Sequence, residues 1–239
     1  MKVDVLGVKI NDITLDEAIK IAEKLINAPG KYYIVTPNPE IIVAAQKDLR
    51  YKNILNDADL AIPDGIGLKF SGKVKNRVTG VDFVEKLIGL CAQKGYTVSF
   101  LGGEEGVAEK AKERLKAQYQ NISVKFAGSG GRFDKEGNLL SGQSAKIPPS
   151  DVLLVALGPG KQEKWIAANL KNTPVKLFIA VGGTLDYLSG NISRAPKFVR
   201  NLGLEWFYRV ILQPWRIKRQ LALIKYIWLL TSARLRMLS

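Results

Sequence analysis

The stretch VLLVALGPGKQE, residues 152–163, decides the fold class of this 239-residue chain. Its first half is an unbroken run of valine, leucine and alanine, which is typical of a strand buried on both faces. Glycine, proline and polar residues follow at once, and a helical pattern begins at residue 161. A buried strand that leads through a glycine turn into a helix predicts a mostly parallel sheet covered by helices.

The same alternation of strand and helix extends along most of the chain. Apolar strand patterns occupy residues 2–8 (KVDVLGV), 31–36, 60–63, 97–101, 123–127, 152–157 and 175–181. Helical patterns occupy residues 14–27, where Thr14 suits the N-cap, and residues 39–55, 80–94, 104–118 and 161–170. We therefore expect an α/β chain with a Rossmann-like parallel sheet, helices on both of its faces, and a core domain over residues 1–193.

Glycines and polar residues gather immediately after the predicted strands. The six strand ends read TPNPE (36–40), PDGIG (63–67), GGEEG (102–106), GSGGRFD (128–134), LGPGKQE (157–163) and GGTLD (182–186). Ligands of parallel α/β sheets bind at the carboxyl ends of the strands, where glycine lets the backbone approach a phosphate closely. The pattern predicts a nucleotide or another phosphorylated ligand at this edge.

The composition excludes several kinds of chemistry. The chain has no histidine and a single cysteine, Cys91, so histidine-based nucleophilic catalysis, disulfides and the usual zinc sites are ruled out. A general base must be Asp, Glu, Lys or Tyr. No segment matches the P-loop or a clean dinucleotide-binding fingerprint, and the Asp57-Ala58-Asp59 triplet precedes its strand. We expect that the protein needs neither a metal ion nor another cofactor.

Positive charge is concentrated near the end of the sequence. Residues 194–239 hold ten Lys or Arg and one acid, Glu205, and so carry +9 of the net +14. Three of the four tryptophans (Trp206, Trp215 and Trp228) lie in the same segment among leucines and isoleucines. Basic residues beside tryptophan on an amphipathic segment are typical of a membrane interface. No signal peptide and no apolar run of roughly 20 residues is seen, so we expect a cytoplasmic protein bound peripherally to the inner membrane face through this helical appendage.

With these features, the sequence resembles the WecG/TagA/CpsF glycosyltransferases, family 26 of the sugar-nucleotide transferases. The resemblance is carried by TPNPEIIVAAQ, IPDGIG, RVTGVDFV, VALGPGKQEKWI and the long segment GGTLDYLSGNISRAPKFVRNLGLEWFYRVILQPWRIKR. It spans roughly residues 5–219. The resemblance implies an inverting transferase that moves a sugar from a UDP-sugar to a sugar on undecaprenyl diphosphate.

The resemblance also implies the substrates and the assembly. N-acetylmannosamine transferred to N-acetylglucosamine, for wall teichoic acid or another surface polysaccharide, is the main expectation; glucose and N-acetylmannosaminuronic acid are the alternatives. Family members are thought to form dimers that give way to active monomers at the membrane. The appendage is thought to close over the active site.

Asp64 is the predicted catalytic base, because inversion requires one group to take a proton from the acceptor hydroxyl and the family places its base at this motif. The alternative role of Asp64 is that of an ordinary turn residue in the Pro-Asp-Gly sequence. Thr36 and Asn38 are predicted to bond sugar hydroxyls, although Asn38 also suits a helix cap.

The predicted substrate-binding residues come from the remaining strand ends and the appendage. Arg77 is predicted either to bind a phosphate or a sugar carboxylate through its guanidinium group, or to form a surface ion pair with Asp82. One of Gln162 and Glu163 is expected to touch the donor, and Glu163 equally suits the first turn of a helix. The other candidates are Gly102 and Gly103 for the diphosphate, Asp186 for the ribose hydroxyls, and Arg209, Arg216 and Arg219 for the acceptor diphosphate.

The spacing of Arg209, Arg216 and Arg219 allows all three to share one helical face, unless Pro214 breaks the helix.

Two alternative functions, neither of them enzymatic, remain. A nucleic-acid-binding module would use the basic appendage, but basic residues there alternate with bulky apolar ones, which favours lipid, so we expect no nucleic acid partner. A noncatalytic tethering protein would have no use for the glycine-rich edge.

Overall fold

The computed structural model describes residues 2–142, 145–214 and 217–236. Its central sheet has the strand order β4-β3-β10-β9-β5-β6, and every neighbouring pair is parallel. The strands are β3 (Tyr32–Val35), β4 (Leu60–Ala61), β5 (Thr97–Gly102), β6 (Ser123–Gly128), β9 (Ser150–Ala156) and β10 (Val175–Ala180). The predicted Rossmann-like sheet is confirmed, and all six strand ends lie at the same edge.

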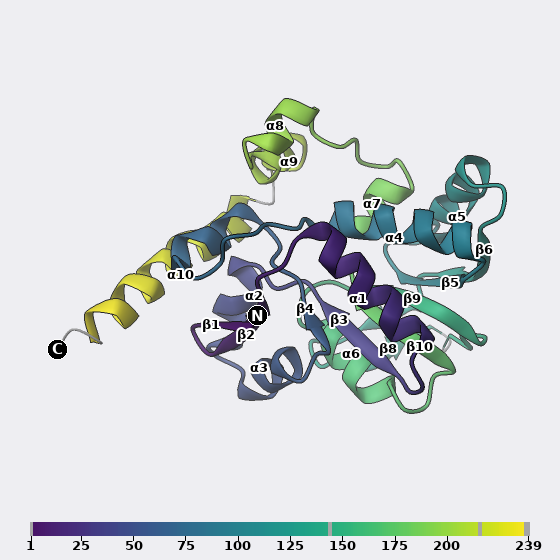
Figure 1. Cartoon of the computed structure of the whole chain (residues 1–239), viewed down its shortest axis with the longest axis horizontal. Helices are drawn as coiled ribbons and strands as arrows, with labels where there is room; N and C mark the ends of the chain where they lie inside the picture. Colours follow the sequence, from purple (N-terminus) through teal and green to yellow (C-terminus); the bar gives the residue numbers. More distant parts are fainter. Residues whose placement is uncertain (1, 143–144, 215–216, 237–239) are drawn as a thin grey trace.

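Helices cover the sheet on both faces, and each face has its own apolar core (Figure 1). One face packs against α1 (Leu15–Asn27), α4 (Gly80–Lys94), α5 (Val107–Gln118) and α7 (Thr184–Leu188). The other packs against α2 (Pro39–Ala45), α3 (Leu49–Asn56), α6 (Lys161–Asn169) and the hairpin of β1 (Lys2–Val5) and β2 (Val8–Asn11). The strands are therefore buried on both sides, as their continuous apolar sequences predicted.

Three predicted boundaries are wrong. Residues 2–8 form two strands rather than one, because Leu6 and Gly7 both adopt positive φ (54° and 80°) in a tight hairpin turn. Residues 39–55 form two helices, because the Asp48 side chain accepts a hydrogen bond from the backbone N–H of Tyr51 and starts α3. The helix predicted from residue 104 begins at Val107.

Two short elements flank the carboxyl edge of the sheet. The 3-10 helix η1 (Ile66–Ser71) follows β4, and a small antiparallel hairpin of β7 (Arg132–Phe133) and β8 (Leu139–Ser141) follows β6. The hairpin is tied down by Lys161, whose Nζ donates to the carbonyl oxygen of Phe133 at 2.9 Å. Both elements therefore stand beside the edge where a ligand is expected.

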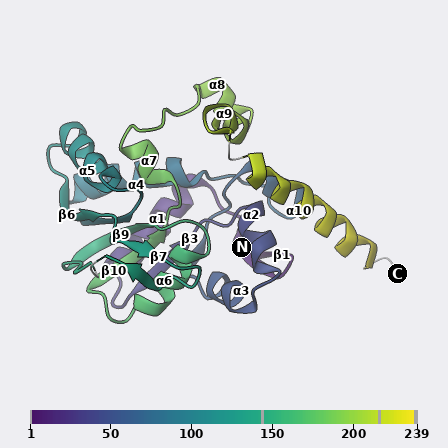
Figure 2. The same ribbon diagram turned by 180° about the vertical axis from the view of Figure 1, so that it is seen from behind.

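The C-terminal segment forms three helices, α8 (Lys197–Asn201), α9 (Glu205–Leu212) and α10 (Ile217–Arg236). Figures 1 and 2 show α8 and α9 beyond the edge of the sheet, with α10 extending away from the body. The α10 helix is anchored by Tyr226, which is fully buried in the core on the α2 face. Within the described parts of the chain, no helix has the length and hydropathy to span a membrane.

The helical face proposed for the three arginines does not form across the appendage. Helix α9 ends at Leu212 before Pro214, and α10 begins at Ile217. Arg209 and Arg219 therefore lie on different helices, whereas Arg216 lies outside the described residues. Pro214 explains the break, because proline lacks the N–H that a continuous helix requires.

Candidate active site

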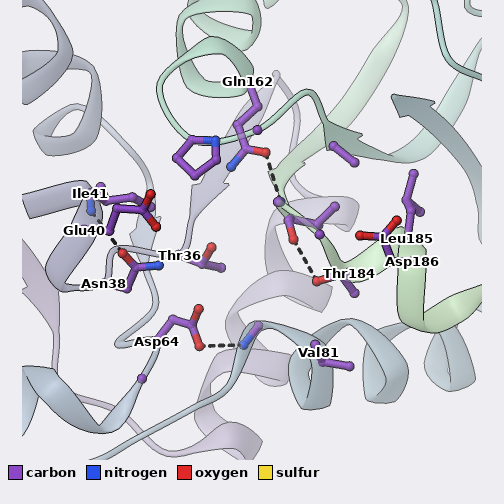
Figure 3. Close-up of a pocket in the computed structure, with 18 of the residues that line it drawn as sticks. Thr36, Asn38, Glu40, Ile41, Asp64, Val81, Gln162, Thr184, Leu185 and Asp186 are labelled. Carbon is purple, nitrogen blue, oxygen red and sulfur yellow. Dashed lines mark hydrogen bonds between the residues drawn. The ribbon is translucent and has the colours of Figure 1, made fainter. Parts of the chain in front are cut away.

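A cavity of about 770 Å³ opens at the carboxyl ends of the strands (Figure 3). It lies where β3 and β10 are neighbours while their helical connections run toward opposite sides of the sheet, the arrangement that creates a binding crevice in such folds. The hydroxyl of Thr36 bridges the two strands by donating to the carbonyl oxygen of Ala180 at 3.1 Å. Residues of α9 and α10, including Trp206, Arg209 and Leu223, complete the wall.

Asp64 lies in the cavity wall, after β4. Its Oδ1 accepts a hydrogen bond from the backbone N–H of Gly80, the first residue of α4, at 3.1 Å. Its own N–H donates to the carbonyl oxygen of Pro37 at 3.0 Å, which fixes the turn against the loop after β3. The side chain is thus held by the N-terminus of a 15-residue helix and faces the cavity.

Burial raises the pKa of Asp64 to about 6. The hydrogen bond from Gly80 and the charge of Arg77 oppose this rise, whereas the carboxylates of Glu205 and Asp82 add to it. A carboxyl group with a pKa near neutrality is suited to accept a proton in a reaction at physiological pH.

Thr36 and Asn38 lie with Asp64 on one side of the cavity (Figure 3). The side chain of Asn38 accepts a hydrogen bond from the N–H of Ile41 at 3.0 Å and caps α2. The helix-cap reading of Asn38 is therefore realised in the structure. The residue still lines the cavity, so its bond to a sugar hydroxyl stays a prediction.

Gln162 and Glu163 have different surroundings although they are adjacent. Gln162 lines the cavity, and its Oε1 accepts from the N–H of Gly182 at 2.9 Å. Glu163 is completely buried, and its carboxylate accepts from Gly160 N at 2.7 Å and from Gln162 Nε2 at 2.9 Å. Burial raises the pKa of Glu163. Of the two, Gln162 is the one placed to touch a ligand, and Glu163 orients it.

Only one of the two glycines predicted to hold the diphosphate lines the cavity. Gly103 does so, with a φ of 79°. Gly102 packs against β9, where an added Cβ would meet the carbonyl oxygen of Ala156 at 2.5 Å. The need for glycine at residue 102 is therefore explained by the close approach of two strands.

Arg77 lines the cavity and donates through Nη2 to the carbonyl oxygen of Arg200 in α8 at 2.8 Å. The ion pair predicted as its alternative is not formed between the described residues, because Asp82 pairs instead with Arg194 (2.8 Å) and Arg200 (3.5 Å). Arg77 therefore ties the appendage to the cavity wall.

Asp186 and Arg209 meet across the opposite wall. Arg209 Nη2 lies 3.3 Å from Asp186 Oδ2, and the guanidinium stacks over the ring of Tyr187 at 4.9 Å from the centroid. Gly183 makes room for this contact, since an added Cβ would lie 2.7 Å from Arg209 Nη2. The structure thus brings together Asp186 after β10 and Arg209 of α9, residues that were predicted separately.

Several cavity residues were not predicted from sequence. They are Glu205, Trp206, Arg132, Phe133 and Lys161. Glu205 is the single acid in a basic segment, a signal that was visible in the sequence, whereas the approach of the β7–β8 hairpin to the cavity left no pattern there.

The described residues contain no group of three or more carboxylate or cysteine side chains able to hold a metal ion. In the Asp57-Ala58-Asp59 triplet, Asp57 caps the C-terminus of α3, and Asp59 Oδ2 accepts from the N–H of Tyr33 at 2.9 Å. The triplet is thus engaged with backbone at the start of β4. Metal independence stays a prediction.

Known proteins are similar to this chain over most of its length. The model of the glycosyl transferase WecG/TagA/CpsF family matches residues 3–239. A Bacillus subtilis (strain 168) protein described as N-acetylglucosaminyldiphosphoundecaprenol N-acetyl-beta-D-mannosaminyltransferase is 37% identical over 198 residues, 81% of this chain and 76% of that protein. A Bacillus spizizenii protein of the same description is 35% identical over 200 residues, 82% and 77% of the two chains. The chain therefore belongs to the WecG/TagA/CpsF family of glycosyl transferases.

Proposed function

We propose that this glycosyltransferase moves N-acetylmannosamine from a UDP-sugar to N-acetylglucosamine on undecaprenyl diphosphate. The descriptions of the two Bacillus relatives support this choice of sugars and lipid. The observation that carries the proposed reaction is the carboxylate of Asp64, held in the cavity wall by Gly80 with a pKa raised by burial to about 6.

The proposed chemistry is a single displacement at the anomeric carbon. The acceptor hydroxyl oxygen forms the new bond to that carbon while the bond to the diphosphate oxygen breaks, and UDP leaves with the electron pair. Asp64 takes the proton from the attacking hydroxyl, and the configuration inverts because attack and departure occur on opposite faces. Thr36 and Asn38 lie beside Asp64 and are proposed to orient sugar hydroxyls.

Cations around the cavity are proposed to offset the charge of the donor diphosphate. Lys161 and Arg132 line it near the hairpin, and Arg209 lines it from α9. Of these, Arg209 is proposed for the acceptor diphosphate, because arginine forks bind phosphate oxygens in pairs. Gly103 allows a close backbone approach, Gln162 offers an amide beside it, and Asp186 is proposed to hold the ribose hydroxyls.

The appendage is proposed to dock on an anionic membrane surface, where the acceptor lies. Large apolar side chains are exposed along the appendage: Phe198, Leu202, Phe207, Ile211, Leu221, Ile224, Ile227 and Trp228. We call these residues the appendage apolar face. They occur among the ten basic residues of 194–239, and each basic residue near an anionic surface contributes on the order of 1 kcal/mol. Conversion of a solution homodimer to a membrane-bound monomer is part of this proposal.

The proposal is tested with purified full-length protein, a panel of UDP-sugars and a short-chain lipid-diphosphate-N-acetylglucosamine acceptor. The expected product carries N-acetylmannosamine with inverted configuration. Transfer only from UDP-glucose or from UDP-N-acetylmannosaminuronic acid would assign one of the alternative donors. No transfer from any donor, together with salt-dependent binding of RNA or DNA, would replace the enzyme reading by a nucleic-acid-binding one.

A further inference from the structure

Arg194 joins three parts of the molecule through one side chain. Its Nη1 lies 2.8 Å from Asp82 Oδ1 and 3.1 Å from Glu85 Oε2, both on α4. Its Nε and Nη2 lie 3.1 and 3.4 Å from the two carboxylate oxygens of Glu205 on α9. The guanidinium also lies 5.9 Å from the ring centroid of Tyr187. A bidentate contact of this kind fixes the orientation of the Glu205 carboxylate as well as its position.

The α4 end of this contact belongs to the turn that holds Asp64. Asp82 accepts a hydrogen bond from the Thr79 hydroxyl, and the Thr79 side chain in turn caps α4 by accepting from Asp82 N at 3.1 Å. Gly80, between them, donates to Asp64. Burial favours the neutral form of Asp82, but the hydrogen bonds from Thr79 and Arg194 hold its pKa below its ordinary value. Asp82 is therefore a charged anchor for α9.

The α9 end of the contact reaches the cavity. Glu205 lines the same cavity as Asp64, and its side chain is 18% exposed. The charges that act on Asp64 come from Glu205 on α9, Asp82 on α4 and Arg77 before α4. The other charged side chains of the cavity are Glu40, Glu104, Arg132, Lys161, Asp186 and Arg209. Among these groups, Glu205 is an acid that the appendage brings to Asp64.

We propose that Glu205 is a positioning residue of the transfer reaction: held by Arg194 to the first turn of α4, it fixes α9 over the cavity whose wall it shares with Asp64. This inference rests on the proposed function, since it takes Asp64 as the base. A negative charge beside Asp64 makes proton uptake more favourable. Glu205 brings such a charge to the cavity, so loss of its carboxylate is expected to weaken Asp64 as a base.

The test compares Glu205→Gln with Glu85→Gln in the full-length enzyme. Both substitutions remove one carboxylate that contacts Arg194, but Glu85 is not among the residues that line the cavity. In Glu205→Gln, the acidic limb of the pH profile of kcat/KM is expected to move down by about half a pH unit, as for loss of one partly screened neighbouring charge. In Glu85→Gln it is expected to stay in place. Hydrogen exchange of residues 205–212 is expected to quicken in Glu205→Gln, which loses the α9 end of the Arg194 contact, and to stay unchanged in Glu85→Gln, while UDP affinity is kept in both.

Equal profiles for the two variants, whether shifted or unshifted, would overturn the inference. Arg194→Gln provides a second test of the inference. We expect faster hydrogen exchange in α9 and at least a tenfold loss of the transfer rate, with UDP affinity unchanged. Normal exchange and normal transfer in that variant would also overturn it. Failure of the proposed function is a separate result, because the wild-type enzyme would then transfer no sugar, or Asp64→Asn would transfer it at the normal rate.

Discussion

The carboxylate of Asp64 accepts a hydrogen bond from the backbone N–H of Gly80 across 3.1 Å, where the loop after β4 meets the start of α4. This bond stabilises the ionised form, and burial opposes it. The balance leaves a carboxyl group that ionises near pH 6 rather than near 4. Such a group is deprotonated under physiological conditions and retains more basicity than an exposed aspartate.

Asp64→Asn is expected to lower the rate of sugar transfer by about 10²–10⁴, the usual cost of losing a general base. The amide keeps the shape of the side chain and its bond from Gly80, so UDP affinity measured by calorimetry should remain close to wild type. Turnover within a factor of three of wild type would return Asp64 to the role of a turn residue.

The stability of the same variant gives an independent prediction. Folding raises the pKa of Asp64 from 3.8 to about 6, so the folded state favours the protonated form. The stability that this contributes is complete below about pH 4 and is lost as the pH rises through 6. At pH 8, Asp64→Asn should therefore be more stable than wild type, by about 3 kcal/mol. Denaturant titrations at pH 4.5 and 8 check this. A difference in unfolding free energy between variant and wild type that does not increase with pH would contradict it.

Arg209→Gln is expected to reduce kcat/KM for transfer about tenfold to a hundredfold, because a charge-assisted hydrogen bond to a phosphate contributes about 1.5–3 kcal/mol. Gly183→Ala should act in the same direction, since its Cβ would displace the guanidinium. Gly89→Ala is the matched control, because a Cβ in that part of α4 has its first neighbour at 3.6 Å. Equal activity of the two alanine variants would show that the place of Arg209 is unimportant.

Transfer is expected to continue in excess EDTA, and added Mg²⁺ or Mn²⁺ should change the initial rate less than twofold. The reason is that the Asp57-Ala58-Asp59 triplet is engaged at the start of β4, away from the cavity lining. Loss of all activity in EDTA, with recovery on adding metal, would require a metal site that the sequence pattern did not predict.

Ile224→Glu and Trp228→Glu are expected to lower binding to vesicles that contain phosphatidylglycerol by tenfold or more. Both side chains belong to the appendage apolar face, and a carboxylate there opposes both apolar insertion and the attraction of the basic residues. Leu49→Glu on α3 is the control, since Leu49 is equally exposed but lies outside the appendage. The docking proposal fails if all three variants sediment with vesicles as wild type does.

Much of the sheet could be predicted from sequence because buried parallel strands are apolar without interruption, as in residues 152–157. The break at Asp48 was missed because an aspartate inside a helical pattern does not reveal whether its side chain points to solvent or caps a new helix. At the site, Asp64 was predicted because an inverting transfer needs a base, the chain has no histidine, and the resembled family places its base at this motif. Glu205 was missed because its role depends on how the C-terminal segment folds back, and no local pattern encodes that contact.

Tyr226 anchors helix α10 of the appendage in the body of the protein. Its ring is buried in the core beneath α10, while Ile224, Ile227 and Trp228 on the same helix face outward. If those outward residues rest on a lipid surface, the height of the cavity above that surface is fixed by the helix rather than by a flexible tether. Under the proposed function, we then expect the helix to decide which acceptor hydroxyl lies level with Asp64, namely one on the sugar next to the lipid diphosphate and not one on a longer saccharide.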